Sequence, residues 1–301
     1  MTEALTTTTA DQARVAYMAL RKKAKAEAVN FAELLVLYKL ERTLHRLTRT
    51  VYREKFVLKG GFLLAAYADR RPTKDIDALL SDLRLDEATV RQVCRAVAAV
   101  DEPDGLTYDV ETATVTEIRE SDDYTGFRAA MTCNLHTDRQ KVAFDFSTGD
   151  PIAPPAVDVV LPGLLGQDVT VRGYVPEMIV AEKYVTALAR GETNTRWRDF
   201  VDLYTVSRTV SVDSDDLLTS LRAVAEHRAV PLVPFAAAVD LANFAGVAQA
   251  RYAAWRRKHG LTELAPERFS DVLDAVVAFV DPLLLVSRPT PPARSGPTPR
   301  S

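Results

Sequence analysis

Residues 56–80 of this 301-residue chain read FVLKGGFLLAAYADRRPTKDIDALL, and they carry the strongest indication of the fold. A short apolar run ends at two glycines, an apolar segment follows, and a second apolar run opens with Asp75 and Asp77. This order predicts a strand over 56–58, a helix over 62–68 and a second strand over 75–80. Residues i and i+2 of a strand point to the same face, so the two aspartates share one side of the predicted sheet.

The paired aspartates and the glycine turn each have two interpretations. Two carboxylates on one strand face repel each other unless solvent or a cation lies between them. At an exposed edge, water separates the two carboxylates. In a cleft beside a glycine turn, Mg²⁺ would lie between them, since it takes one or two carboxylates together with substrate phosphates. The Lys59-Gly60-Gly61 turn is either an ordinary turn or a place where phosphate approaches backbone N–H groups.

A third acidic position follows about seventy residues later. Asp145 lies between two phenylalanines in a predicted strand over 140–146, so its carboxylate points away from the two rings. If the rings are buried, Asp145 lies on the side of Asp75 and Asp77, and three such carboxylates on two metal ions suit in-line phosphoryl transfer. The alternative is a polar position on a half-exposed strand.

The second half of the chain adds a lysine and two further acids. Lys183 lies on a predicted helix over 176–190, and Asp199 and Asp202 share one face of the next predicted helix. A lysine in that setting holds triphosphate oxygens as a point charge, or it forms ordinary surface salt bridges with the acids.

The remaining pattern predicts helices, then an α/β block, then helices. We expect helices over 11–28, capped by Asp11, and from 31 on, capped by Asn30. A helix over 87–100, strands over 107–119 and 128–136, an irregular region over 151–174, and helices over 197–206, 214–226, 235–258 and 266–285 follow. The predicted class is α+β, with a disordered segment over 1–12, an α/β lobe with N-terminal helices over 13–170, a helical lobe over 171–286 and a disordered proline-rich tail over 287–301.

Composition narrows the class of protein. Lys and Arg number 38 against 41 Asp and Glu, a formal charge of −3, and hydrophobic residues make up 47%, which is typical of a globular protein. No apolar run approaches the ~20 residues of a membrane span. Two cysteines form neither a disulfide framework nor a zinc site alone. We therefore expect a reduced, cytoplasmic protein that does not contact a membrane.

The motifs taken together resemble a known signature. Two glycines, thirteen residues, Asp-Ile-Asp and a later lone aspartate resemble the nucleotidyltransferase superfamily. The chain resembles more narrowly the AbiEii/AbiGii/MenT toxin family, through the glycine turn over 56–61 and three further motifs: Arg71-x-Thr73-x-Asp75-Ile76-Asp77, Glu182-Lys183 and Arg196-x-x-Asp199-x-x-Asp202-Leu203. These motifs span about half of the chain, in the family's order.

The resemblance implies a nucleotidyltransferase-like mixed sheet with helices, followed by a helical C-terminal lobe. It implies a toxin of a toxin–antitoxin or abortive-infection system, of type IV for some members, in which the antitoxin does not touch the toxin. The MenT branch transfers nucleotides, typically pyrimidines, from NTP to the 3′ acceptor end of tRNA, which blocks aminoacylation and translation. Whether an antitoxin contacts this chain stays open.

The resemblance also implies roles for individual residues. Asp75, Asp77 and Asp145 would hold Mg²⁺, and Asp145 would activate the attacking 3′-hydroxyl. Lys183 would contact the triphosphate, and Asp202 would complete the pocket. The remaining nucleotide-binding residues implied by the motifs are Lys59, Gly60, Gly61, Arg71, Thr73 and Asp199.

A tRNA acceptor requires a basic surface near the cleft. Residues 14–59 contain 12 Lys or Arg and four Glu, a net charge of +8, and are one candidate for that surface. The cations of a late helix are another: Arg251, Arg256, Arg257 and Lys258. Two alternatives use the same motifs, namely a nucleotidyltransferase acting on a small molecule, of the antibiotic type, or on a protein, and a nucleotide-binding module without catalysis.

Overall fold

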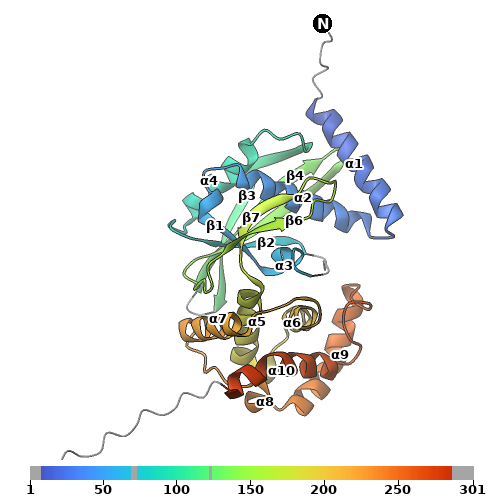
Figure 1. Cartoon of the computed structure of the whole chain (residues 1–301). Coiled ribbons are helices and arrows are strands. Elements are labelled where there is room, and N and C mark those ends of the chain that lie inside the picture. The colour runs from blue at the N-terminus through green and yellow to red at the C-terminus, as the bar shows by residue number, and fades with distance from the viewer. Residues whose placement is uncertain (1–7, 69–72, 122–123, 287–301) are drawn as a thin grey trace, which may run out of the picture.

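The computed structural model describes residues 8–68, 73–121 and 124–286, and Figure 1 shows how their helices and strands are arranged. The described residues contain a seven-stranded mixed sheet in the order β3-β4-β5-β2-β1-β7-β6. The strands are β1 (Phe56–Lys59), β2 (Asp75–Leu80), β3 (Leu106–Ser121), β4 (Tyr124–Leu135), β5 (Asp138–Ser147), β6 (Val157–Leu161) and β7 (Val169–Gly173).

Helices cover one face of this sheet and gather beyond one of its ends. α1, α2 and α4 pack on the strands, and the later helices form a separate group that joins the sheet through α3 and α5 (Figure 1). The helices are α1 (Thr9–Ala26), α2 (Phe31–Thr48), α3 (Gly60–Leu64), α4 (Glu87–Ala99), α5 (Pro176–Arg190), α6 (Trp197–Thr209), α7 (Ser214–His227), α8 (Phe235–Ala238), α9 (Leu241–Lys258) and α10 (Phe269–Val286), with short 3₁₀ turns η1 (Arg53–Lys55) and η2 (Gly191–Thr193). The predicted α+β class, a mixed sheet followed by helices, is confirmed.

The central strands carry the pattern that positions the site. β2 runs antiparallel to β1 and parallel to β5, and β4 runs antiparallel to β5. Phe144 and Phe146 are fully buried and stack on each other with ring centroids 5.4 Å apart. Because side chains alternate along a strand, Asp145 lies on the opposite face of the sheet from these rings. The condition set for Asp145 by the sequence is therefore met.

The region over 151–174, which we expected to be irregular, contains two antiparallel strands, β6 and β7. Val159, Leu161, Val169 and Val171 alternate with exposed or half-exposed residues, a strand pattern that the surrounding prolines obscure. β7 also pairs in parallel with β1. The predicted boundary between lobes at 170 and 171 falls inside β7, and the division into lobes stays a prediction.

Several predicted helix ends differ from the structure. α1 begins at Thr9, inside the segment expected to be disordered, and Thr8 rather than Asp11 caps it, because the Thr8 hydroxyl accepts from the Asp11 amide. The short helix after the glycine turn begins at Gly60 and ends at Leu64. The helix expected over 235–258 is two helices, since Asp240 caps a new helix with its side chain. Residues 1–7 and 287–301 lie outside the described residues.

Most of the cations in the middle of α2 are buried in ion pairs, so they do not form an exposed basic surface. Lys39, Arg42 and Arg46 are buried, and they pair with Asp138, Glu41 and Asp104 respectively. The pairs of Lys39 and Arg46 join α2 to the start of β5 and to the chain that precedes β3, while the pair of Arg42 with Glu41 lies within α2. In the part of the chain that the structure describes, no helix combines the length and the apolar character needed to cross a membrane.

Candidate active site

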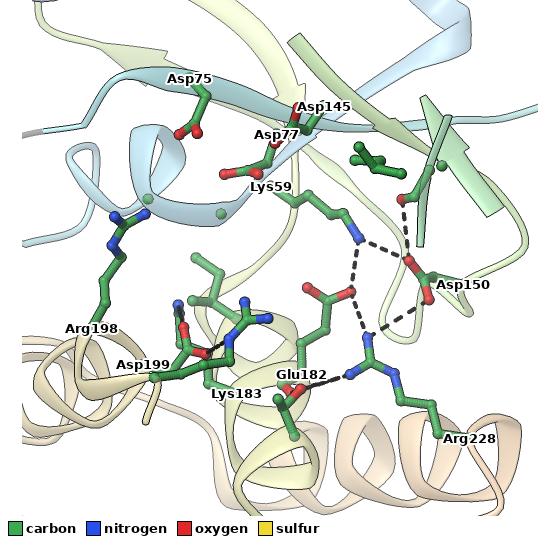
Figure 2. A pocket seen from close by; sticks show the side chains of 18 of the residues that line it. Lys59, Asp75, Asp77, Asp145, Asp150, Glu182, Lys183, Arg198, Asp199 and Arg228 are labelled. Atoms are coloured by element: carbon green, nitrogen blue, oxygen red, sulfur yellow. Dashed lines mark hydrogen bonds and ion pairs between the residues drawn. The ribbon is translucent and has the colours of Figure 1, made fainter. Parts of the chain in front are cut away.

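A cleft of about 680 Å³ opens between the central strands and the helices α5 and α6, with Arg228 at the end of α7 (Figure 2). Its strand side carries the three aspartates expected from the sequence, and its helix side carries a lysine and several arginines. Figure 2 shows the aspartates on one wall and the labelled residues of α5 and α6 on the other. Residues far apart in the sequence therefore share one cavity.

The three aspartates come from two adjacent parallel strands. Asp77 stands directly opposite Asp145 in the pairing of β2 with β5, and Asp75 precedes Asp77 by two residues on the same face. Neighbouring strands lie about 4.8 Å apart, so the three carboxylates are close neighbours. The cross-strand row continues on both sides, because Lys59 of β1 faces Asp77 and Arg128 of β4 faces Asp145.

The glycine turn fits tightly against one of these carboxylates. Gly60 has a φ of +69°, which side chains rarely allow. A Cβ atom placed on Gly60 would lie 2.0 Å from Oδ2 of Asp77. The turn therefore needs glycine at this position both for its backbone conformation and for the approach of Asp77.

Asp77 carries an unusual protonation equilibrium. Burial is the largest cause of its raised pKa, which reaches about 7, and the charges of Asp75 and Asp145 add to the shift. Lys59 and Lys183 oppose it more weakly. A carboxylate that is hard to ionise next to two others indicates a demand for positive charge at this point of the cleft.

An arginine that the sequence did not single out partly meets that demand. Arg128 donates from Nη2 to Oδ2 of Asp75 at 2.8 Å, and its Nε lies 2.9 Å from Oδ1 of Asp145. Its role depends on the register between β4 and β5, which sequence spacing does not give. The guanidinium therefore bridges two of the three carboxylates.

On the helix side, Lys183 is held by two acids of α6. Its Nζ lies 2.9 Å from Asp199 and 2.8 Å from Asp202, and Arg196 approaches Asp199 at 2.6 Å. Burial would raise the pKa of Asp199, but the positive charges of Lys183 and Arg196 outweigh it and hold that pKa at about 2. Asp202 is almost fully buried behind Lys183 and does not line the cleft. These ion pairs connect α5 with α6 and hold the positive charge of Lys183 beside the cavity.

A third cluster closes the opposite end of the cleft, and the sequence had singled out only two of its members, Lys59 and Glu182. Lys59 Nζ lies 2.8 Å from Asp150 and 3.3 Å from Glu182, and Arg228 reaches the same two acids at 3.8 and 3.6 Å (Figure 2). Burial would raise the pKa of Asp150, but Lys59 lowers it below its usual range. The cluster joins β1, the chain after β5, α5 and the end of α7.

The remaining expected nucleotide-binding residues fall in different places. Gly60 and Gly61 line the cleft, and so does Lys59, although it is engaged with Asp150 and Glu182. Thr73 is buried, and its hydroxyl donates to the backbone oxygen of Asp75 at 3.4 Å. Arg71 lies outside the described residues.

The donor set on the strand wall suits a hard divalent cation. Asp75, Asp77 and Asp145 offer only carboxylate oxygens, which Mg²⁺ prefers. Burial raises the pKa of Asp77, and the charges of the other two aspartates raise it further. As they stand, no three acidic, histidine or cysteine side chains among the described residues are grouped to hold a metal ion. Arg128 already pairs with two of the three aspartates and acts as their cation. The three carboxylates therefore fit a divalent cation in their chemistry.

The two basic surfaces expected to face an RNA do not form the rim of the cleft. None of the residues of 14–59 except Lys59 lines the cavity, and neither do the late-helix cations. Arg256 is held by backbone oxygens of Thr262 and Ala265. The exposed cations that do line the cleft are Arg128, Arg190, Arg196 and Arg198. Of these, Arg190 and Arg198 form no ion pair within the described ranges.

Comparison with known proteins gives one family and two similar structures. The model of the family described as "Nucleotidyl transferase AbiEii toxin, Type IV TA system" matches residues 42–275, a range that contains the whole cleft. A search of curated proteins gives no match. The crystal structure of JHP933 from Helicobacter pylori is 15% identical with a TM-score of 0.44, covering 82% of this chain and 90% of that chain. The crystal structure of a "putative nucleotidyltransferase from H. pylori" is 15% identical with a TM-score of 0.45, covering 84% of this chain and 95% of that chain.

Proposed function

The chain belongs to the AbiEii family of nucleotidyl transferase toxins of type IV toxin–antitoxin systems, and we propose that it transfers a nucleotide from an NTP to the 3′ end of tRNA with Mg²⁺ as cofactor. Capping the 3′ end in this way blocks aminoacylation and hence translation. The observation that carries the proposal is the cross-strand row of carboxylates beside a glycine turn, facing a cleft lined by cations.

The strand wall holds the metal in this proposal. Asp75, Asp77 and Asp145 bind Mg²⁺ through their carboxylate oxygens. When bound, the metal neutralises charge on the phosphate oxygens and lowers the barrier to displacement. Gly60 and Gly61 form the border that the triphosphate approaches, because they carry no side chain there.

The chain's own residues orient the reaction. The 3′-hydroxyl oxygen of the acceptor bonds to the α-phosphorus of the NTP, the bond from that phosphorus to the bridging oxygen breaks, and pyrophosphate leaves with the electron pair. Asp145 accepts the hydroxyl proton. Lys183, held in place by Asp199 and Asp202, lends positive charge to the triphosphate.

The rim of the cleft supports an acceptor with a phosphate backbone. Arg190 and Arg198 are exposed, line the cavity and form no ion pair among the residues described, so their charge is available to an anion. Figure 2 shows Arg198 rising from α6 toward the wall that carries Asp75. Phosphate contacts of this kind make binding strongly dependent on salt. A tRNA acceptor also places the protein in the cytoplasm, and the type IV system supplies an antitoxin that need not touch this chain.

The test incubates purified protein with total tRNA, Mg²⁺ and each labelled NTP in turn. We expect label at the tRNA 3′ end from one NTP, a pyrimidine by resemblance, and none with Asp145→Asn. Asp158→Asn is the matched control, because Asp158 is an exposed strand aspartate on β6, outside the cleft. No label on any RNA, despite intact NTP binding, would reject the tRNA acceptor.

A further inference from the structure

Arg128 forms ion pairs with two of the aspartates that would bind the metal. Its guanidinium bridges two acids, with Nη2 2.8 Å from Asp75 and Nε 2.9 Å from Asp145. The two carboxylates are 18% and 21% exposed, while the arginine side chain is 43% exposed. The acids are thus mostly covered, whereas the arginine side chain is more exposed to solvent.

The register of the β-sheet places Arg128 beside these acids. Arg128 is the direct cross-strand partner of Asp145 in the β4–β5 pairing, and Asp145 is the direct partner of Asp77. A planar guanidinium presents several N–H donors in a fixed fork, so one arginine can pair with two acids at once. Here Nη2 donates a hydrogen bond to Asp75, and Nε forms an ion pair with Asp145. The carboxylates of the same two acids are the ones that would hold the proposed metal.

A guanidinium and a divalent metal cannot both occupy the same carboxylate oxygens. A metal held by Asp75 and Asp145 would either displace Arg128 from these carboxylates or have the positive charge of Arg128 directly beside it. Charge repulsion at such short range disfavours the second arrangement. Metal binding and the ion pairs of Arg128 are therefore competing states of one site.

We propose that Arg128 is a built-in counter-cation of the metal site, which holds Asp75 and Asp145 in the metal-free protein and leaves them when a divalent cation binds. This inference rests on the proposed function, because it takes the three aspartates as metal ligands. Its consequence is that the apparent metal affinity is reduced by the fraction of molecules in which Arg128 is engaged.

The direct test observes Arg128 itself in the wild-type protein. In ¹⁵N-labelled protein, the Nε–H group of an ion-paired arginine exchanges slowly with water and gives a resolved NMR signal, which is assigned by its absence in Arg128→Lys. We expect this signal in the presence of EDTA, and its shift or loss when Mg²⁺ is added. A signal unchanged at metal concentrations that saturate the site overturns the proposal.

The second test measures metal affinity without measuring activity. Mn²⁺ is titrated and the free ion is counted by electron paramagnetic resonance, for wild type, Arg128→Gln and the matched control Arg139→Gln. Arg139 is another arginine of the β4–β5 hairpin, 67% exposed, whose ion pair with Asp109 lies away from the cleft. We expect Arg128→Gln to bind Mn²⁺ about tenfold more tightly or better, and Arg139→Gln to match wild type.

Thermal unfolding distinguishes this role from a merely structural one. Without metal, Arg128→Gln leaves the carboxylates without their counter-cation, so its melting temperature falls; with Mg²⁺ it recovers, and the metal-induced rise exceeds that of wild type. An equal fall with and without metal, together with unchanged Mn²⁺ affinity, overturns the proposal while the metal site stands. If neither wild type nor variant binds metal, the metal-dependent function itself fails, and the role of Arg128 fails with it.

Discussion

Replacing Gly60 with alanine tests the geometry of the site at its tightest point. The added Cβ would lie 2.0 Å from Oδ2, 2.6 Å from Cγ and 2.7 Å from Cβ of Asp77. Non-bonded heavy atoms prefer separations of roughly 3.5 Å, so the aspartate or the turn must move by about 1.5 Å. A misplacement of 1 Å at a reacting centre costs about 100-fold in rate.

The same substitution also strains the backbone. Gly60 has a φ of +69°, and an alanine in that region costs about 1–2 kcal/mol of stability. Gly166 separates the two effects, because its φ is +87° and a Cβ there meets nothing within 4 Å. Gly166→Ala therefore carries the backbone strain without the collision.

The assay compares both variants by urea unfolding and by nucleotide transfer from labelled NTP. We expect both to lose about 1–2 kcal/mol from backbone strain, and only Gly60→Ala to lose about 100-fold or more in kcat/KM. Equal transfer rates in the two variants would show that the contact between Gly60 and Asp77 does not position the carboxylate, and the reasoning from this geometry would be wrong.

Three further outcomes follow from the structure. The pKa of Asp77 is raised from 3.8 to about 7, so folded protein keeps this proton when the unfolded chain has lost it, and without metal its stability should fall as the pH rises through that interval. Asp77→Asn should lack this fall when unfolding in urea with EDTA is compared at pH 5 and pH 8. An identical pH dependence in wild type and Asp77→Asn would contradict the assignment. Lys183→Met leaves Asp199 and Asp202 buried without their shared cation, and it should lower the free energy of unfolding in urea by about 3 kcal/mol. A loss below about 1 kcal/mol, as for an exposed ion pair, would show that this cluster does not hold α5 against α6. Asp240→Ala removes the side chain that caps α9, so it should lower the free energy of unfolding by about 1 kcal/mol while nucleotide transfer stays unchanged. An unaltered unfolding curve would mean that the separation of α8 from α9 does not depend on this cap.

Local pattern predicted the part of the site that local geometry determines. Asp75 and Asp77 lie two residues apart on one strand, so their common face follows from the alternation of side chains alone. Asp145 was placed conditionally, and the burial of Phe144 and Phe146 met the condition. The roles of these residues in catalysis stay predictions, which the proposed experiments test.

What the sequence did not reveal depends on the pairing of distant segments. Arg128 reaches the site only because β4 and β5 pair in one register, and a shift of one residue would turn it to the other face. The charge count of residues 14–59 likewise does not say which cations are buried, and Lys39, Arg42 and Arg46 proved to be internal ion-pair partners. Counting charge along a chain therefore predicts a surface only where burial is known.

The ion pairs of the cleft show that most of its acids have cationic partners from the chain itself. Asp75 and Asp145 share Arg128, Asp150 and Glu182 share Lys59 and Arg228, and Asp199 shares Lys183 and Arg196. Asp77 has no ion-pair partner within the described part of the chain, and it is the acid whose pKa rises to about 7. A divalent cation arriving at the strand wall thus meets one uncompensated carboxyl group and two that are already paired. Binding must release the proton of Asp77 and break the ion pairs of Arg128, so metal affinity should increase with pH more steeply in wild type than in Asp77→Asn.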